Sequence, residues 1–536
     1  MVCNPIRSIL SGARARKTAL SAALAFSLAA SSAAPSFAQL SLCCLDPLRF
    51  DTNVVTTDLA KHLPAAGVRK YSKSVGFLRW ETIHTLSVMA ETRRGLSSRY
   101  WVSDTRTWSP WIHHGNPSNA PIQRIPGSGD TAGIDTGLAL ISGYSASGSD
   151  WIAYQGFGRP VTGAEPDFKT SLMQVNAPAG TMASIESDPN IVTASSPTLP
   201  GDFDHFNPQT GFFSPSPLGS NRLVRHVFGT GVPRGHVRSN RFASANVPLV
   251  ELRREHDSMT PQWISHGVPN LPGVSGLTGV AVGPSSATSI IHNYLGGATA
   301  ADRSEQRYVF VATNPAEDGY GEGINGDQVA FLKGDGQTFG WNSLGSPGSF
   351  VYGAPLAIPY YTNVPISGGL GRIVVFAVVR TGSGSHVLKS RFHDGNAWDA
   401  QWQNFGAPSE LGGDKFKLTS AVVYWDGTPN QMANLRINAF GYSEELGSRK
   451  GQLVEFFWDG ASWRFAAPRP APDGESFRTS HASVIDQGTT DRIVVVGRTD
   501  TGRIYEFARE VSNGQVTSET WTDLSWERLT LTRVGP

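Results

Sequence analysis

A short tryptophan motif recurs along this chain and restricts the folds that it can adopt. The motif reads W-x-x-Φ-G-x-P, where Φ is His, Leu or Phe. Its complete copies are Trp111–Pro117, Trp263–Pro269, Trp341–Pro347 and Trp402–Pro408. An aspartate precedes each copy: Asp104, Asp257, Asp335 and Asp394. Two weaker copies follow, one with Asp459 and Trp463 and one with Asn513, Gly514 and Trp521. Repetition of this kind indicates a chain built from equivalent structural units.

A second periodic feature lies upstream of the tryptophan motif. Short β-branched runs that begin with arginine recur about every 60 residues in the second half of the chain. They start at Arg307, Arg372, Arg436 and Arg492. Another apolar run separates each of them from its aspartate turn, and a third run precedes it. Each unit therefore predicts strand, loop, strand, turn, strand, tight turn and tryptophan strand, which is a four-stranded antiparallel meander.

A single meander cannot bury both of its faces, so several such sheets are expected to pack radially as the blades of a β-propeller. Six copies are visible, and the interval between Asp104 and Asp257 has room for one more. Residues 139–144 and 151–154 are its best strand candidates. The predicted fold class is therefore all-β, a single propeller of seven four-stranded antiparallel blades. Long loop insertions are expected in its N-terminal half. Gly 58, Pro 34 and Trp 14 fit many short strands joined by turns.

The N-terminus predicts export. Four basic residues precede an apolar run over 18–34, and Ser36 and Ala38 supply the small residues that a signal peptidase recognises. We therefore expect a signal peptide over 1–38, an N-terminal segment over 39–80 that closes the ring, and the propeller over 81–536. Within it, 118–220 holds the poorly legible blade and a Gly/Pro/Ser-rich loop over 177–220. No later run has the length of a membrane span, so the mature protein is expected to be secreted or periplasmic.

Composition and motifs exclude several functions. The formal net charge is +1 and charged residues make up 17% of the chain, without a basic run, so nucleic acid is not an expected partner. The chain has no H-E-x-x-H, no G-x-S-x-G and no phosphate-binding glycine loop. Cysteine is scarce, with Cys43 and Cys44 as the only two after the signal. Neither a disulfide framework nor an organic cofactor is predicted.

The motif residues allow structural and ligand-binding interpretations. The aspartates and glycines suit tight hairpins. The first aromatic residue of each copy accepts Phe, as a packing position does, whereas the second is Trp in all four complete copies. A retained indole suits either stacking against a sugar or a fixed hydrogen bond to a neighbouring blade. His114 and His266 align with Leu344 and Phe405, which favours packing over catalysis or metal binding. The carboxylates of Asp318, Glu322 and Asp327, interleaved with glycines, could bind calcium or form a solvated hairpin.

The repeat resembles that of the secreted β-propeller lectins of bacteria and fungi, the tectonin-like and fucose-binding group, whose blades carry the same succession of turn, tryptophans and G-x-P. In that family, monosaccharides bind in clefts between blades through tryptophan rings and nearby arginines. The resemblance therefore implies a carbohydrate-binding protein without catalysis, with glycans as partners. It implies these ligand-binding residues: Trp111, Trp263, Trp341, Trp402, Arg372, Arg436 and Arg492.

Two alternatives remain open at this point. A sialidase-like propeller hydrolase or lyase would place a single active site at the mouth of the ring, with acidic residues and an arginine cluster in one pocket. A protein-interaction scaffold would use the same fold without either activity.

Overall fold

The computed structural model of the 536-residue chain divides into two compact units, Met1–Val54 and Val55–Pro536. All described residues belong to the second unit and lie between residues 64 and 525. Inside this unit, the longer stretches that the structure does not describe are 116–138, 159–170, 177–189, 195–202, 234–247, 270–287, 295–302, 313–328 and 362–370, with shorter ones between other strands.

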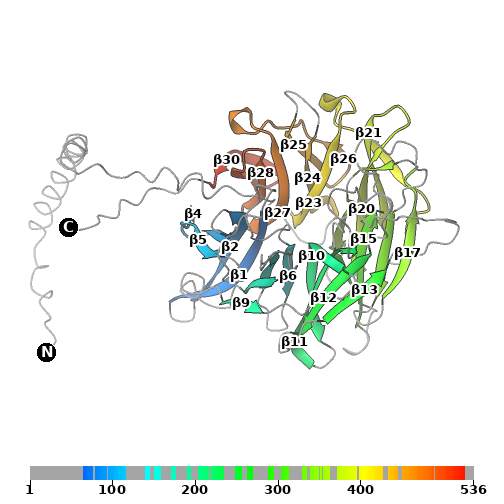
Figure 1. Ribbon diagram of the computed structural model, residues 1–536. Helices are drawn as coiled ribbons and strands as arrows, with labels where there is room; N and C mark the ends of the chain where they lie inside the picture. Colours follow the sequence, from blue (N-terminus) through cyan, green and yellow to red (C-terminus); the bar gives the residue numbers. More distant parts are fainter. Residues whose placement is uncertain are drawn as a thin grey trace, which may run out of the picture. The chain divides into compact units, whose positions relative to one another are not determined.

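The described residues form β-strands and turns, without an α-helix (Figure 1). This confirms the all-β prediction. No described segment is a helix that could cross a membrane. The strands of the first two sheets are β1 (Ala65–Gly76), β2 (Arg79–Thr92), β3 (Gly95–Val102), β4 (Thr107–Trp108), β5 (Ile112–Gly115), β6 (Ala139–Tyr144), β7 (Asp150–Gly158), β8 (Ser171–Asn176), β9 (Asn190–Ala194), β10 (Phe203–Ser216), β11 (Gly219–Pro233), β12 (Leu249–Glu255) and β13 (Gln262–Gly267). Those of the later sheets are β14 (Thr288–Tyr294), β15 (Arg303–Ala312), β16 (Val329–Gly334), β17 (Phe339–Gly345), β18 (Phe350–Val351), β19 (Leu356–Tyr361), β20 (Gly371–Arg380), β21 (His386–His393), β22 (Gln403–Gly406), β23 (Phe416–Trp425), β24 (Leu435–Ser443), β25 (Leu453–Trp458), β26 (Trp463–Phe465), β27 (Phe477–Asp486), β28 (Asp491–Thr499), β29 (Ile504–Ser512) and β30 (Gln515–Asp523).

Hydrogen bonding groups these strands into six sheets. The first sheet is β1–β5, the second β6–β13, the third β14–β17, the fourth β18–β22, the fifth β23–β26 and the sixth β27–β30. In the third, fifth and sixth sheets, four strands follow one another in order, each antiparallel to the next. The predicted four-stranded meander is therefore confirmed.

The second strand of each later sheet is the one that the arginine-led runs predict. In β20, the residues from Ile373 to Val379 are all buried, and in β28 the same holds from Ile493 to Val496. These runs show no alternation because other sheets cover both of their faces. The first strand β23 alternates instead between buried and half-buried residues, as a strand with one covered face does.

The second sheet differs from the sequence prediction. It has eight strands, because the meanders β6–β9 and β10–β13 join through a short parallel pairing of Gly211 and Phe212 with Ile141 and Ser142. The strands predicted at residues 139–144 and 151–154 are present as β6 and β7. The long loop predicted over 177–220 is wrong, since β9 and β10 lie within it. Its Gly, Pro and Ser content concealed phenylalanine-rich stretches that form strands.

The core consists of apolar layers between successive sheets. Phe228 of the second sheet packs with Val309 of the third, and Phe310 of the third belongs to one cluster with Val375 of the fourth. The fourth and fifth sheets share a further cluster, as do the fifth and sixth. The sixth sheet then packs against the first, where Ile485, Val494 and Val496 meet Ala66, Leu86 and Trp101. In Figure 1 the blue strands β1 and β2 accordingly lie beside the orange β27.

Strand β1 is also close to β6 and β7 of the second sheet. The order of contacts among the sheets is therefore cyclic. Strand β1 lies within the segment 39–80, which the sequence associates with closure of the ring, and it takes part in the contact between the first and sixth sheets. We call each interface between successive sheets a seam.

Candidate functional site

The second tryptophan of the motif makes the same hydrogen bond at three seams. The indole N–H of Trp341 donates to the carbonyl of His266 at 2.8 Å, and that of Trp402 donates to the carbonyl of Leu344 at 3.2 Å. The N–H of Trp111 donates to Leu524 at 2.8 Å. Each acceptor is the Φ residue of the preceding sheet's motif, three positions after its tryptophan. The sixth sheet precedes the first in this series, as the cyclic packing requires.

An arginine supports the same acceptor at two of these seams. Arg391 donates through Nε to the carbonyl of Asp399 in its own sheet and through Nη1 to Leu344 of the preceding sheet. Arg99 repeats both bonds, with Nε to Ser109 at 2.7 Å and Nη1 to Leu524 at 2.6 Å. At each of these seams, one backbone carbonyl thus accepts hydrogen bonds from an indole N–H and a guanidinium N–H. These bonds join adjacent sheets without using a side-chain acceptor.

These bonds bear on the two interpretations of the tryptophans. Trp111 is only 5% exposed, and Trp263, Trp341 and Trp402 are half-buried. The hydrogen-bonding alternative fits the retention of Trp at 111, 341 and 402, because Phe would remove the indole N–H that donates across each seam. Their role as sugar-stacking surfaces stays a prediction.

The first aromatic residue of each motif packs across the seam, as predicted. Trp398 contacts Phe310 and Phe331 of the preceding sheet, with ring centroids 5.9 and 5.6 Å apart. Phe339 meets His266 edge to face at 5.3 Å. The aspartates behave as hairpin residues: Asp394 Oδ1 accepts from the N–H of Ala397 at 2.9 Å, and Asp459 Oδ1 accepts from two N–H groups of its own turn.

Strand pairing reveals a feature of the third strand of each sheet that cannot be seen in the tryptophan motif. One residue of the third strand has an equivalent place in the strand register of every sheet. In most sheets it pairs with the residue that directly follows the motif tryptophan. The residues at this position are Ser98, Glu251, Phe331, Ser390 and Glu506, together with Glu455, whose pairing with the second strand matches that of Glu506. The three glutamates are fully buried, at 0%, 1% and 0% exposure. A buried carboxylate is stable only when it is paired, so each glutamate identifies a polar centre at its seam.

Glu251 is neutralised within the second sheet. Its carboxylate accepts from His226 Nδ1 at 2.6 Å, His266 Nε2 at 2.8 Å and Arg253 Nε at 3.0 Å. Burial raises the pKa of Glu251, but the hydrogen bonds of both histidines and the charges of His226 and Arg253 together hold it well below its ordinary value. His266 therefore does more than fill the apolar position predicted for it. The side chain of His114 lies outside the described residues.

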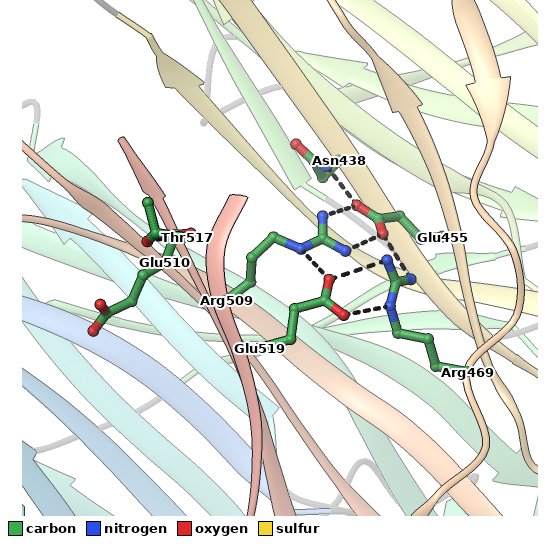
Figure 2. A network of polar contacts seen from close by, with 7 residues as sticks. All are labelled: Asn438, Glu455, Arg469, Arg509, Glu510, Thr517 and Glu519. Carbon is green, nitrogen blue, oxygen red and sulfur yellow. Dashed lines mark hydrogen bonds and ion pairs between the residues drawn. The ribbon is translucent and has the colours of Figure 1, made fainter. Parts of the chain in front are cut away.

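Glu455 belongs to an ion network between the fifth and sixth sheets (Figure 2). Arg509 of the sixth sheet binds it with both terminal nitrogens at 2.6 Å, Arg469 adds a bond at 3.0 Å, and Asn438 donates at 2.6 Å. Both arginines also bind Glu519. Burial raises the pKa of Glu455, but the charges and hydrogen bonds of Arg509, then Arg469, lower it below its ordinary value. In the strand register, Glu519 has the place that the first aromatic residue of the motif has in other sheets. At this place the seam therefore contains charged side chains, whereas other described seams contain aromatic rings.

Glu506 lies at the seam between the sixth and first sheets. Arg492 Nη2 binds its Oε1 at 2.7 Å, and the indole N–H of Trp108 donates to its Oε2 at 3.1 Å. The guanidinium of Arg492 also lies over the ring of Trp101, 4.9 Å from its centroid. Its Nε is buried and, among the described residues, has no hydrogen-bond acceptor. We call this group, formed by Arg492, Glu506, Trp101 and Trp108, the Arg492 site.

The other two predicted arginines lie in different surroundings. Arg436 occupies the place in the fifth sheet that Arg492 has in the sixth. It binds the carbonyl of Ala433 and the carboxylate of Asp426, at 2.6 and 3.3 Å, and is not hydrogen-bonded to Glu455. Arg372 is half-buried, and its Nε also has no acceptor in the described part of the chain. Of the predicted residues, the structure brings Arg492 and Trp111 to one seam.

The predicted metal ligands Asp318, Glu322 and Asp327 fall outside the described residues. Within the described part of the chain, no group of three His, Cys, Asp or Glu side chains is arranged to hold a metal ion.

The glutamates are the residues that sequence reasoning missed. A signal exists, because each stands between apolar neighbours in a strand, as V-E-L, V-E-F and Y-E-F. A charged residue with apolar neighbours on both sides in a strand indicates a paired buried group.

No protein-family model matches the chain, and no curated protein matches it. Solved structures similar to it include the alpha-L-arabinanase of Penicillium chrysogenum complexed with arabinobiose, with 12% identity, 71% of this chain and 94% of that chain covered, and a TM-score of 0.36. A sialidase of Trypanosoma rangeli has 10% identity and a TM-score of 0.34, over 73% of this chain and 56% of its own length. The SapL1 lectin in complex with alpha methyl fucoside has 12% identity and a TM-score of 0.32, over 73% and 96%. At this distance the similarity carries no assignment of activity.

Proposed function

We propose that this chain is a secreted or periplasmic carbohydrate-binding protein, built as a seven-bladed β-propeller and without catalytic activity. The blade count takes the two meanders of the second sheet as two blades, β6–β9 and β10–β13. The repeated indole bond supports a ring, because Trp111 joins the first sheet to the sixth as Trp402 joins the fourth to the third.

The observation that carries the sugar-binding proposal is the Arg492 site. A sugar presents hydroxyl groups at its edge and an apolar C–H face, so its site needs charged hydrogen-bonding groups beside an aromatic ring. The partly exposed Arg492 supplies donors and the half-buried Trp108 supplies the ring, and the buried carboxylate of Glu506 holds both side chains in place. The Nε–H of Arg492 is buried and has no acceptor among the described residues, and a sugar hydroxyl that entered beside it would satisfy it.

A comparison of the Arg492 site with the other seams argues against equal sugar binding at every seam. At the seam of the fifth and sixth sheets, the carboxylate of Glu519 stands at the place where other described seams have the first aromatic residue of the motif, and it is bound by Arg509 and Arg469. Between the third and fourth sheets, Phe331 and Trp398 fill the place with packed rings. We therefore propose fewer sugar sites than blades, with the Arg492 site as the best equipped of the described seams.

One observation favours an enzyme as the second candidate. Arg492 also approaches Glu510, with Nη1 3.8 Å from its Oε1, so two carboxylates flank one guanidinium. Glycoside hydrolases use two carboxyl groups on either side of the scissile bond. A protein-interaction scaffold is the third candidate and would need neither group.

Glycan-array binding and reducing-sugar release, measured together on the mature protein, test the proposal. We expect binding without turnover, and loss of at least tenfold in affinity in Arg492→Ala. The matched control is Arg436→Ala, at the same place in the fifth sheet, which should bind as the parent does. Turnover abolished by Glu506→Gln or Glu510→Gln would establish the hydrolase instead. Absence of both binding and turnover would leave the scaffold.

A further inference from the structure

A group of basic side chains gathers where the first strands of the fifth and sixth sheets begin. Lys417 and Arg478 lie at the starts of β23 and β27, and Arg498 lies at the end of β28. Lys415 precedes β23, and Lys450 precedes β25. We call these five residues the basic patch. Arg478 is 45% exposed and Lys450 is 36% exposed, and Lys415 is also exposed, so solutes can reach the patch.

Two arginines of the patch face each other directly. Arg478 and Arg498 form a cross-strand pair between β27 and β28. Like charges at such a pair are destabilising. In agreement with this, burial and the charge of Arg478 lower the pKa of Arg498. Asp500 accompanies them, but it also binds Lys450 at 2.6 Å and lies 3.4 Å from Arg478.

The lysines on the fifth sheet extend the patch. Lys417 binds Glu444 at 2.9 Å. The ammonium groups of Lys417 and Lys415 lie 5.0 and 5.9 Å from the ring centroid of Tyr352. Among the described residues, the ion pairs of Lys417, Lys450 and Arg478 use two carboxylates, those of Glu444 and Asp500, so three cations share two carboxylates. This excess is local, because the chain as a whole carries a net charge of +1.

We infer that the basic patch binds an oxyanion group of an acidic glycan, a carboxylate or a sulfate. Paired guanidinium groups bind such groups with two parallel hydrogen bonds, and an anion between Arg478 and Arg498 would remove their mutual repulsion. The ring of Tyr352 offers a surface for the remainder of the sugar. The patch is separate from the Arg492 site, because Arg492 and Arg498 lie near opposite ends of β28, about 20 Å apart along the strand.

The test measures affinity for three oligosaccharides of similar length: a carboxylated oligogalacturonate, a sulfated chain and an uncharged maltooligosaccharide, with inorganic phosphate as the free anion. The double variant Arg478→Gln, Arg498→Gln should lose at least tenfold in affinity for one of the acidic chains. The control Arg464→Gln removes an exposed arginine of the fifth sheet that binds Asp459, and should bind as the parent does. If the double variant fails to fold, Lys450→Gln can replace it, because Lys450 lies on a loop. Its affinity for the same acidic chain should fall about threefold.

Unchanged affinity of the folded double variant for both acidic chains would overturn the inference. Phosphate that binds as tightly as the acidic chains would overturn the glycan part of it. The two proposals can fail separately, because Arg492→Ala should reduce binding of uncharged sugars only, and the basic-patch variants should reduce binding of acidic chains only.

Discussion

The indole N–H of Trp111 lies 2.8 Å from the backbone carbonyl of Leu524, although 413 residues separate them in sequence. The bond has the same form as that between Trp402 and Leu344 in adjacent sheets. The first and sixth sheets are thus joined in the manner of sheets that follow each other along the chain.

The first prediction concerns this bond. Trp111→Phe keeps most of the buried ring and removes the N–H, while Arg99 still donates to the Leu524 carbonyl, so the free energy of unfolding should fall by about 0.5–1.5 kcal/mol. Trp458→Phe is the matched control, because the N–H of Trp458 is buried without an acceptor among the described residues. Its removal should be neutral or slightly stabilising. Urea denaturation of both variants measures their free energies of unfolding. Equal decreases in the two variants would show that the hydrogen bond of Trp111 makes no specific contribution to stability.

The second prediction concerns the ion network of Figure 2. Glu455→Gln leaves Arg509 without its buried partner and should lower the free energy of unfolding by about 3–5 kcal/mol. Glu519→Gln changes a carboxylate that binds the same arginines but is 34% exposed, and should cost under about 1 kcal/mol. Thermal denaturation at pH 7 separates them, and a larger effect at Glu519 would contradict the assignment.

The network also predicts a pH dependence. The pKa of Glu455 lies below its ordinary value of 4.5 in the folded chain, because its arginine partners outweigh the effect of burial. Its contribution to stability is therefore complete above about pH 4.5 and is lost as the pH falls through the lower folded pKa. The stability difference between the parent and Glu455→Gln should be largest at neutral pH and shrink in acid. A difference independent of pH would contradict this.

Much of the fold follows from local sequence, whereas the polar centres do not. The β-branched runs after Arg372 and Arg492 predict buried strands, and the aspartate turns predict the hairpins. Glu251, Glu455 and Glu506, however, lie at different distances from the following tryptophan, because the hairpins between them differ in length. Only the strand register shows that they are equivalent. Their partners are also remote, since Arg509 follows Glu455 by 54 residues.

The next prediction concerns His481 of β27. Its Nδ1 lies 3.2 Å from the carbonyl of Pro64, and burial lowers its pKa from 6.5 to about 4. The unfolded chain therefore takes up a proton below about pH 6.5, whereas the folded chain does not do so until about pH 4. This linkage makes stability fall with pH across that interval, by about 2 kcal/mol at pH 5. His481→Gln keeps an N–H donor for Pro64 but does not titrate, so its stability should change less between pH 7 and pH 5. An unchanged slope in urea denaturation at the two values would refute the role of His481.

The last prediction concerns a glycine on which two strands close. Gly441 of β24 faces a bulge in β23, where the register shifts between Leu418 and Ser420. A Cβ at Gly441 would overlap the carbonyl oxygen of Lys417, which is backbone and cannot move aside. Gly497 has the same relation to Arg478 in the sixth sheet, so the close approach belongs to the architecture of both sheets. Gly441→Ala should therefore destabilise the chain by about 3 kcal/mol.

Gly340 of β17 supplies the control for Gly441. It has open space around the position of a Cβ and does not have the left-handed backbone that favours glycine. Gly340→Ala should be neutral or stabilise by up to about 1 kcal/mol, because alanine restricts the unfolded chain. Melting temperatures of the two variants provide the comparison. If Gly441→Ala melted with the parent, β23 and β24 could not approach as closely as the bulge implies, and the matching arrangement in the sixth sheet would need to be revised with it.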